Sequence, residues 1–236
     1  MDNGMWAVWY NLDPAKRDAH LQWLHETYLP DIVACPGIVW AANYRVDEDE
    51  YRERRDQLTH TSDPIPQGTQ FVCLIAAASP QLFFREESPL MEDNLSSETR
   101  TRLAEREEAR LAVLLEEERV NGPAYGLATP GGVPAAAIQM GSFNMTELKT
   151  DVLIGQWYAR LRMPDMAKTP GVILTRKLTA TVGWCRHAVL YEFESHDMRR
   201  EHAIQPHSAW SKAAVDATVH APGSPLIGYR TWPAPE

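Results

Sequence analysis

The chain has 236 residues, of which 44% are hydrophobic, and a formal net charge of -9. The apolar fraction supports a sizeable core, while an acidic balance without any Lys/Arg-rich run argues against a nucleic-acid partner, because phosphate binding needs clustered cations. With no window near the roughly 18 apolar residues of a membrane span, no signal-peptide pattern and three scattered cysteines, a cytoplasmic protein without a disulfide framework is expected.

The first elements of the chain alternate between strand and helix. Residues 6–10 form a short aromatic and β-branched run that predicts a strand. Asp13 followed by Pro14 is a typical helix start, and Pro36-Gly37 is a typical helix end. Residues 38–46 then alternate with period two, which predicts a second strand.

Three further segments complete a first unit. Residues 71–78 predict a third strand, and Ser79-Pro80 repeats the helix-start pattern. The segment 96–119 is rich in Glu, Arg, Leu and Ala and carries a thin leucine stripe, which predicts a long, mostly solvated extra helix at about 96–120. Residues 124–129 are expected to close the sheet, so the unit has the order β-α-β-β-α-β.

The first half of this pattern recurs 134 residues later without a gap. Because Trp, Pro and Gly are uncommon, the recurrence indicates two copies of one structural unit in a single chain. The matching pairs are Gln22-Trp23 with Gln156-Trp157, Pro30-Asp31 with Pro164-Asp165, and Pro36-Gly37 with Pro170-Gly171.

The second copy follows the same order of elements. Strands are predicted at 137–143, 172–180, 187–193 and 226–232, and a helix at about 146–168. A Pro-, Gly- and Ala-rich segment links the copies, so the units are expected at 1–130 and 131–236.

A ferredoxin-like sheet carries its helices on one face, and its other face must be covered. Two such units in one chain can cover each other's open faces. The predicted fold class is therefore α+β, with tandem ferredoxin-like (βαββαβ) units forming an α+β barrel and an extra long helix inserted in the first unit.

The helix end and strand start at residues 28–39, YLPDIVACPGIV, resemble the dimeric α+β barrel superfamily, in particular its EthD-like members. Those proteins typically carry a Pro near the end of the first helix and then Pro-Gly before strand two, and here the pattern appears twice. The superfamily includes cofactor-independent monooxygenases, muconolactone-type isomerases, polyketide and aromatic cyclases, and two-unit haem proteins. The resemblance implies a ligand between sheet and helices. EthD-like members often carry a His shortly before the helix-end Pro, where this chain has Tyr28 and Arg162, with His25 one turn earlier.

His25 is the first candidate for chemistry, because it lies at the edge of the helix stripe that should face the sheet. A His there can act as a general acid or base near neutral pH, and Tyr28 and Tyr44 complete the predicted catalytic set. Aromatic walls suit a flat substrate, although core packing is the alternative interpretation of each ring. The expected aromatic lining of the same cavity is Trp9, Tyr10 and Trp40.

A second set of candidates lies in unit two. His187 and Tyr191 fall on one face of the third strand, Arg176 lies on the second strand, and Arg162 is near the helix end. Facing His, Tyr and Arg side chains can polarise a carbonyl group or hold an enolate. These four are predicted substrate-binding residues, with a local ion pair of Arg162 as the alternative.

No metal site and no bound cofactor are predicted. His202 and His207 are five residues apart with Pro206 between them, so they do not share a helix face as an i, i+4 metal pair would. A single proximal His for haem stays open. The sequence contains no dinucleotide-binding glycine pattern, P-loop or nucleophile elbow.

The favoured hypothesis is a cofactor-independent enzyme that acts on a small aromatic or polyketide-like compound by general acid/base chemistry. An isomerase, cyclase, dehydratase or lyase fits this set of side chains, and so does a cofactor-free monooxygenase. The first alternative is a non-catalytic small-molecule binding or accessory protein, and the second is a haem enzyme. The expected partner is a small-molecule substrate, without nucleic acid or membrane, and a homodimer stays open.

Overall fold

The computed structural model describes residues 2–128, 132–203 and 208–235. The predicted unit boundary at 130/131 and the candidate His207 lie outside these residues. Unit one contains these elements: β1 (Gly4–Leu12), α1 (Arg17–Trp23), a π-helical turn (Leu24–Tyr28), α2 (Leu29–Val33), β2 (Ile38–Val46), α3 (Glu48–Arg55), β3 (Phe71–Ala77), short 3-10 turns (Pro80–Phe84, Glu92–Asn94 and Tyr125–Leu127), α4 (Ser97–Leu103) and β4 (Arg106–Asn121).

Unit two repeats the order of these elements. It contains β5 (Ala137–Met145), a 3-10 turn (Leu148–Thr150), α5 (Asp151–Trp157), a π-helical turn (Tyr158–Arg162), α6 (Met163–Met166), β6 (Val172–Val182), β7 (His187–Phe193), α7 (His196–Met198), a second π-helical turn (Arg199–Ala203), α8 (Ala209–Asp216), β8 (Thr218–His220) and β9 (Leu226–Trp232).

Eight of these strands close into one antiparallel barrel, in the order β7-β6-β4-β1-β3-β2-β9-β5, with β5 pairing back to β7. The short β8 pairs beside β9 on the end of β5. The last strand of each unit joins the two halves, because β4 pairs with both β1 and β6 while β9 pairs with both β2 and β5. The predicted tandem α+β barrel is therefore confirmed.

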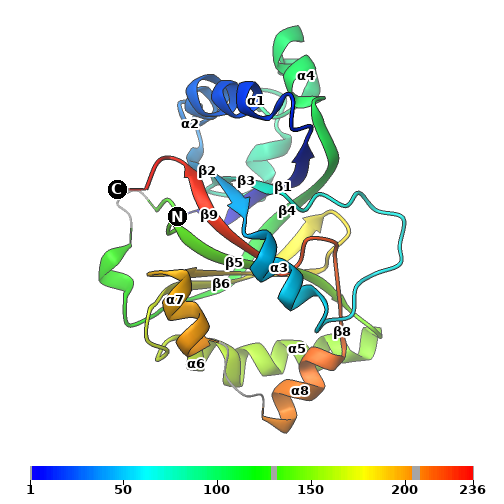
Figure 1. The fold of residues 1–236 in the computed structure, drawn as a ribbon, viewed down its shortest axis with the longest axis vertical. Coiled ribbons are helices and arrows are strands. Elements are labelled where there is room, and N and C mark those ends of the chain that lie inside the picture. Colours follow the sequence, from blue (N-terminus) through cyan, green and yellow to red (C-terminus); the bar gives the residue numbers. More distant parts are fainter. Residues whose placement is uncertain (1, 129–131, 204–207, 236) are drawn as a thin grey trace.

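The barrel interior and two outer helix layers bury separate sets of side chains. Trp9, Tyr44, Met140 and Leu190, from both units, meet inside the barrel. Each unit's open sheet face is thus covered by the other unit, as its apolar strands require. On the outside, α1 and α2 cover the sheet of unit one, and α5, α6 and α8 cover that of unit two on the opposite side of the barrel (Figure 1).

The predicted long helix at 96–120 is wrong, and so is the closing strand at 124–129. The structure has only the short α4 there, followed by the 16-residue strand β4. Glu, Arg, Leu and Ala favour a helix in isolation, but here pairing on both edges overrides that propensity. Arg110, Ala112 and Leu114 face the barrel while Leu111 and Val113 face the helix layer, so burial on both faces hides the period-two pattern.

Candidate functional site

The helix that follows the first strand contains a π-helical turn at the same repeat position in both units. Leu24–Tyr28 and Tyr158–Arg162 are π-helical and lie 134 residues apart. Each turn directly precedes a short helix, α2 or α6, whose second residue is the repeated proline, Pro30 or Pro164. Proline lacks the backbone N–H and its ring collides with the carbonyl four residues earlier, and a wider i, i+5 turn relieves that collision. Such turns often occur at functional sites.

In unit two this turn borders a cavity of about 330 Å³ between the sheet and the helices. Its volume is at the small end of the range for ligand pockets. Apolar side chains and Gly141 form much of its surface, and polar groups line the rest. Its walls include Gln139, Phe143, Val189 and Tyr191 from the sheet, Ile154, Trp157, Tyr158 and Arg162 from α5 and the π turn, Asp216 and Lys212 from α8, Thr218 and His220 from β8, and Gln57 and Leu58 from unit one.

Arg162, Tyr191 and Tyr158 form a polar cluster in this cavity. The Arg162 Nε–H donates to the Tyr191 hydroxyl at 3.1 Å, and its guanidinium carbon lies 4.9 Å from the centre of the Tyr191 ring. Burial alone would lower the pKa of Arg162, but the contacts with Tyr191 raise it above its usual value, so the guanidinium stays charged. Burial, and then the neighbouring Tyr191, hold the pKa of Tyr158 well above its usual value. A fixed cation and a protonated phenol therefore lie close together.

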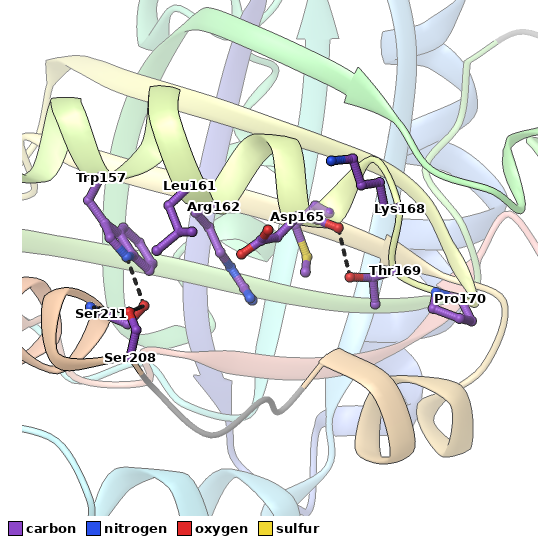
Figure 2. Close-up of a pocket in the computed structure, with 10 residues that line it drawn as sticks. Trp157, Leu161, Arg162, Asp165, Lys168, Thr169, Pro170, Ser208 and Ser211 are labelled. Atoms are coloured by element: carbon purple, nitrogen blue, oxygen red, sulfur yellow. Dashed lines mark hydrogen bonds between the residues drawn. The ribbon is translucent and has the colours of Figure 1, made fainter.

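A second cavity of about 470 Å³ shares Trp157 and Arg162 with the first. Figure 2 shows Arg162 extending from its helix between Leu161 and Asp165, toward the strands. The Trp157 Nε1–H donates to the Ser211 hydroxyl at 3.1 Å, which ties α5 to α8 beside both cavities. Arg162 thus lies in a wall common to the two spaces.

His220 and Asp216 line the first cavity from β8 and α8. The two ring nitrogens of His220 lie 3.1 Å from the Thr218 and Ser224 hydroxyls, and Thr218 donates onward to the Val215 carbonyl. This pattern fits a neutral imidazole held by its neighbours. Asp216 supplies the carboxylate among the lining residues described above. It forms an exposed ion pair with Lys212 at 2.6 Å.

The structure brings together only part of the predicted unit-two set. Arg162 and Tyr191 both line the cavity. His187 shares their sheet face, but it stacks on Phe143 and contacts Asp151 at 3.2 Å. Arg176 lies on the opposite face, because neighbouring residues of a strand alternate between faces.

Arg176 is buried inside the barrel and is held by carboxylates. Its guanidinium donates to Asp2 at 2.5 Å and to Glu116 at 2.6 Å, while only 1% of the residue is exposed. Attraction to Arg176 and Arg119 lowers the pKa of Asp2 to about 2 even though burial opposes the shift. Arg176 therefore anchors the N-terminus and does not face the cavity.

The predicted unit-one lining does not form a single cavity. Trp9, Trp40 and Tyr44 point into the barrel, whereas Tyr10 and Tyr28 point into the helix layer. Trp9 and Tyr10 are adjacent in β1, so one strand must place them on opposite faces. Tyr44 donates to the carbonyls of Pro134 and Ala135, which makes it a buried tie between the units.

His25 and Tyr28 lie near the sheet but in different surroundings. The Nε2 atom of His25 is 3.4 Å from the Asn43 amide nitrogen, and Asn43 accepts a hydrogen bond from Tyr10 at 2.9 Å. Burial lowers the pKa of His25, which favours a neutral ring. Tyr28 stacks on Trp23 with ring centres 5.2 Å apart, and burial raises its pKa to about 12. The role of this set stays a prediction.

Tyr158, Gln139 and Asp216 line the cavity and were missed by sequence reasoning. Tyr158 occupies the repeat position of Leu24, so a tyrosine where the first copy has an aliphatic residue was the available signal. Gln139 is a polar residue in the period-two pattern of a buried strand. Asp216 carried no local signal, because an exposed carboxylate on a helix is common.

A metal ion fits the described residues poorly, and so does haem at the histidine that lines the cavity. Within residues 2–128, 132–203 and 208–235, no three His, Cys, Asp or Glu side chains gather as a metal ion would require. A proximal haem ligand needs an accessible imidazole nitrogen, and both nitrogens of His220, the histidine that lines the cavity, already have partners. In the described part of the chain, no helix has the length and apolar character needed to cross a membrane.

Comparison with known proteins gives structural likeness without sequence likeness. No family model matches the chain, and no curated protein matches it. A provisionally assigned monooxygenase from Fusobacterium nucleatum superposes with a TM-score of 0.60 at 7% identity, over 97% of this chain and 93% of that one. An anthrone oxidase-like protein gives a TM-score of 0.61 at 11% identity, over 98% of this chain and 91% of that one.

A provisionally assigned chlorite dismutase gives a TM-score of 0.54 at 12% identity, over 98% of this chain and 96% of that one. All three likenesses extend over both units, so the whole chain and not one half corresponds to these proteins. The EthD-like assignment stays a prediction. What the likenesses show is the fold, an α+β barrel with both halves in one chain.

Proposed function

We propose that this chain is an enzyme that acts on a small, flat aromatic or polyketide-like compound in the unit-two cavity, by holding a substrate oxygen and moving a proton. The observation that carries the proposal is the contact of Arg162 with Tyr191, beside Tyr158, in a cavity that combines apolar walls with polar side chains. A charged guanidinium stabilises a developing oxyanion most strongly where water is scarce.

The three side chains have separate roles in this proposal. Arg162 and Tyr191 hold a carbonyl or phenol oxygen, and Tyr158, whose raised pKa keeps its hydroxyl protonated, donates a hydrogen bond to it. The Asp216 carboxylate accepts the proton that leaves carbon. Isomerisation, cyclisation, dehydration and lyase reactions that begin by removing a proton next to a carbonyl group pass through such an enol or enolate, so one oxygen-holding site can serve each of them.

Cofactor-free oxygenation is a second candidate, favoured by the names of the structural neighbours, which include monooxygenase and anthrone oxidase-like proteins. An enolate formed in the same cavity can reduce molecular oxygen without a bound cofactor. The balanced overall reaction converts a CH₂ group and O₂ into a C=O group and H₂O, and the substrate supplies all the electrons.

Anthrone tests both candidates, because its methylene protons exchange with solvent when its enol forms. Under nitrogen in D₂O, we expect the protein to accelerate deuterium incorporation measured by NMR; in air, oxygen consumption with anthraquinone formation would assign the oxygenation. Binding without exchange or oxidation would support a binding protein instead.

Arg162→Met should lower the catalysed exchange rate about 100- to 1000-fold, the usual effect of removing one oxyanion-stabilising group. The matched control is Tyr28→Phe, the conservative change at the equivalent position of unit one, which should leave the rate within about twofold. Equal rates for Arg162→Met and wild type would refute the assignment of the site.

A further inference from the structure

Gln139 has its amide orientation set by a buried arginine. The side chain lies on β5 in the wall of the unit-two cavity, directly opposite Tyr191 across the strand pair. The Nη1–H of Arg199 donates to the Gln139 Oε1 atom at 2.9 Å. Arg199 is fully buried, with 0% exposure.

This contact decides which end of the amide is free. A guanidinium can only donate hydrogen bonds, so the carbonyl oxygen of Gln139 must face Arg199 and the NH₂ group must point elsewhere. Within the described part of the chain, no residue accepts a hydrogen bond from that NH₂ group, and Gln139 is partly exposed where it lines the cavity. The amide therefore presents N–H donors to the cavity.

The orientation is supported from unit one. Glu50, on α3, pairs with both Arg199 and Arg200, and its own side chain is only 12% exposed. The loop after α3 places Gln57 and Leu58 in the cavity wall. Glu50 of unit one thus holds Arg199, and Arg199 orients the Gln139 amide that unit two presents to the cavity.

We infer that Gln139 determines specificity, with Arg199 and Glu50 as positioning residues, for flat aromatic compounds that carry two neighbouring acceptor oxygens at one end. A carboxylate has this pattern, and so does a hydroxyl beside a carbonyl. Side chains directly opposite across two strands are about 5 Å apart at Cβ, so the donors of Gln139 and the Tyr191–Arg162 pair lie at the same end of the cavity. This inference rests on the proposed function of that cavity.

Two fluorescent probes of matched shape test it. 2-Naphthoate carries two acceptor oxygens at one end, and 2-naphthol carries one. We expect wild type to bind 2-naphthoate more tightly. Gln139→Met should weaken the affinity for 2-naphthoate about tenfold or more, which corresponds to the loss of a hydrogen bond to a charged group. The same variant should change the affinity for 2-naphthol by less than about threefold. Gln139→Glu, which keeps the partner of Arg199 but removes the donors, should abolish the preference for 2-naphthoate.

The matched control is Gln156→Met, on the exposed side of α5, which should change neither affinity. Equal losses for both probes in Gln139→Met would show that Gln139 contributes shape only and would overturn the inference. If wild type binds 2-naphthol tightly and binds 2-naphthoate no more tightly, this inference is refuted while the proposed function is not. Binding of neither probe would refute the proposed function as well.

The positioning role of Glu50 has its own readout. Glu50→Gln should lower the ratio of 2-naphthoate to 2-naphthol affinity by about threefold, because Arg199 loses a charged partner, and Glu50→Asp should restore most of it. A merely structural role would lower the midpoint of thermal unfolding while leaving this ratio unchanged, and that result would remove Glu50 and Arg199 from the inference.

Discussion

The helix layers of the two units share one order of helix, π-helical turn and helix but differ in their contents. In unit one, Tyr28 stacks on Trp23 and Tyr10 stacks on Phe71 at 5.4 Å, so aromatic rings fill the layer. In unit two, the residue equivalent to Tyr28 is Arg162, which reaches a sheet tyrosine beside two cavities. The comparison shows that the same arrangement of helix and sheet can be filled with aromatic rings in one copy and can leave cavities in the other.

The first way to test this comparison is to remove one buried tyrosine ring from each layer. Tyr28→Ala should lower the free energy of unfolding by about 4 kcal/mol, because a closely packed aromatic leaves a hole when truncated. Tyr158→Ala should cost only about 2 kcal/mol, because its ring borders a cavity and neighbouring side chains can relax into the enlarged space. Urea denaturation of both variants measures the difference, and a larger cost for Tyr158→Ala would reverse the assignment of the packed layer.

The second test concerns Glu192, which lies on β7 where the equivalent position of β3 has Ala76. Burial raises the pKa of Glu192 to about 7, so the native state binds a proton more tightly than the unfolded state does. Native stability should therefore fall as pH rises from about 4.5 to 7, by about 3 kcal/mol.

Glu192→Gln should remove this dependence, since the amide oxygen can still accept from the Ala135 N–H, which donates to Glu192 at 2.8 Å. Urea midpoints of wild type and variant at pH 5 and pH 8 give the measurement. A variant that loses as much stability as wild type between these values would show that the carboxyl group is not the cause. The equivalent residue of unit one, Ala76, has no ionisable side chain and therefore contributes nothing to the pH dependence of stability.

The smallest expected effect is that of His25→Ala. Its Nε2 atom lies near Asn43 in the filled layer and does not line the unit-two cavity. Anthrone exchange and 2-naphthoate affinity should therefore stay within about twofold of wild type. A loss of tenfold or more would move the site to unit one and restore the prediction that His25 and Tyr28 act on the substrate.

The sequence alone determined the duplication and most of the element order. Repeated Trp, Pro and Gly residues carry local information, because proline and glycine restrict the backbone wherever they occur. The strands Ile38–Val46, His187–Phe193 and Leu226–Trp232 were predicted with their observed bounds. Arg162 and Tyr191, which line the cavity, belonged to a predicted set of four whose other members, Arg176 and His187, lie elsewhere.

Only the tertiary structure decided that residues 106–121 form a strand, and which unit has the cavity. The strand depends on pairing with β1 and β6, which are distant in sequence, and such pairing outweighs the local preference for a helix. The cavity depends on how completely side chains from separate elements fill one layer. Local patterns specify the direction of a side chain, but the space left between side chains is a property of the whole packed fold.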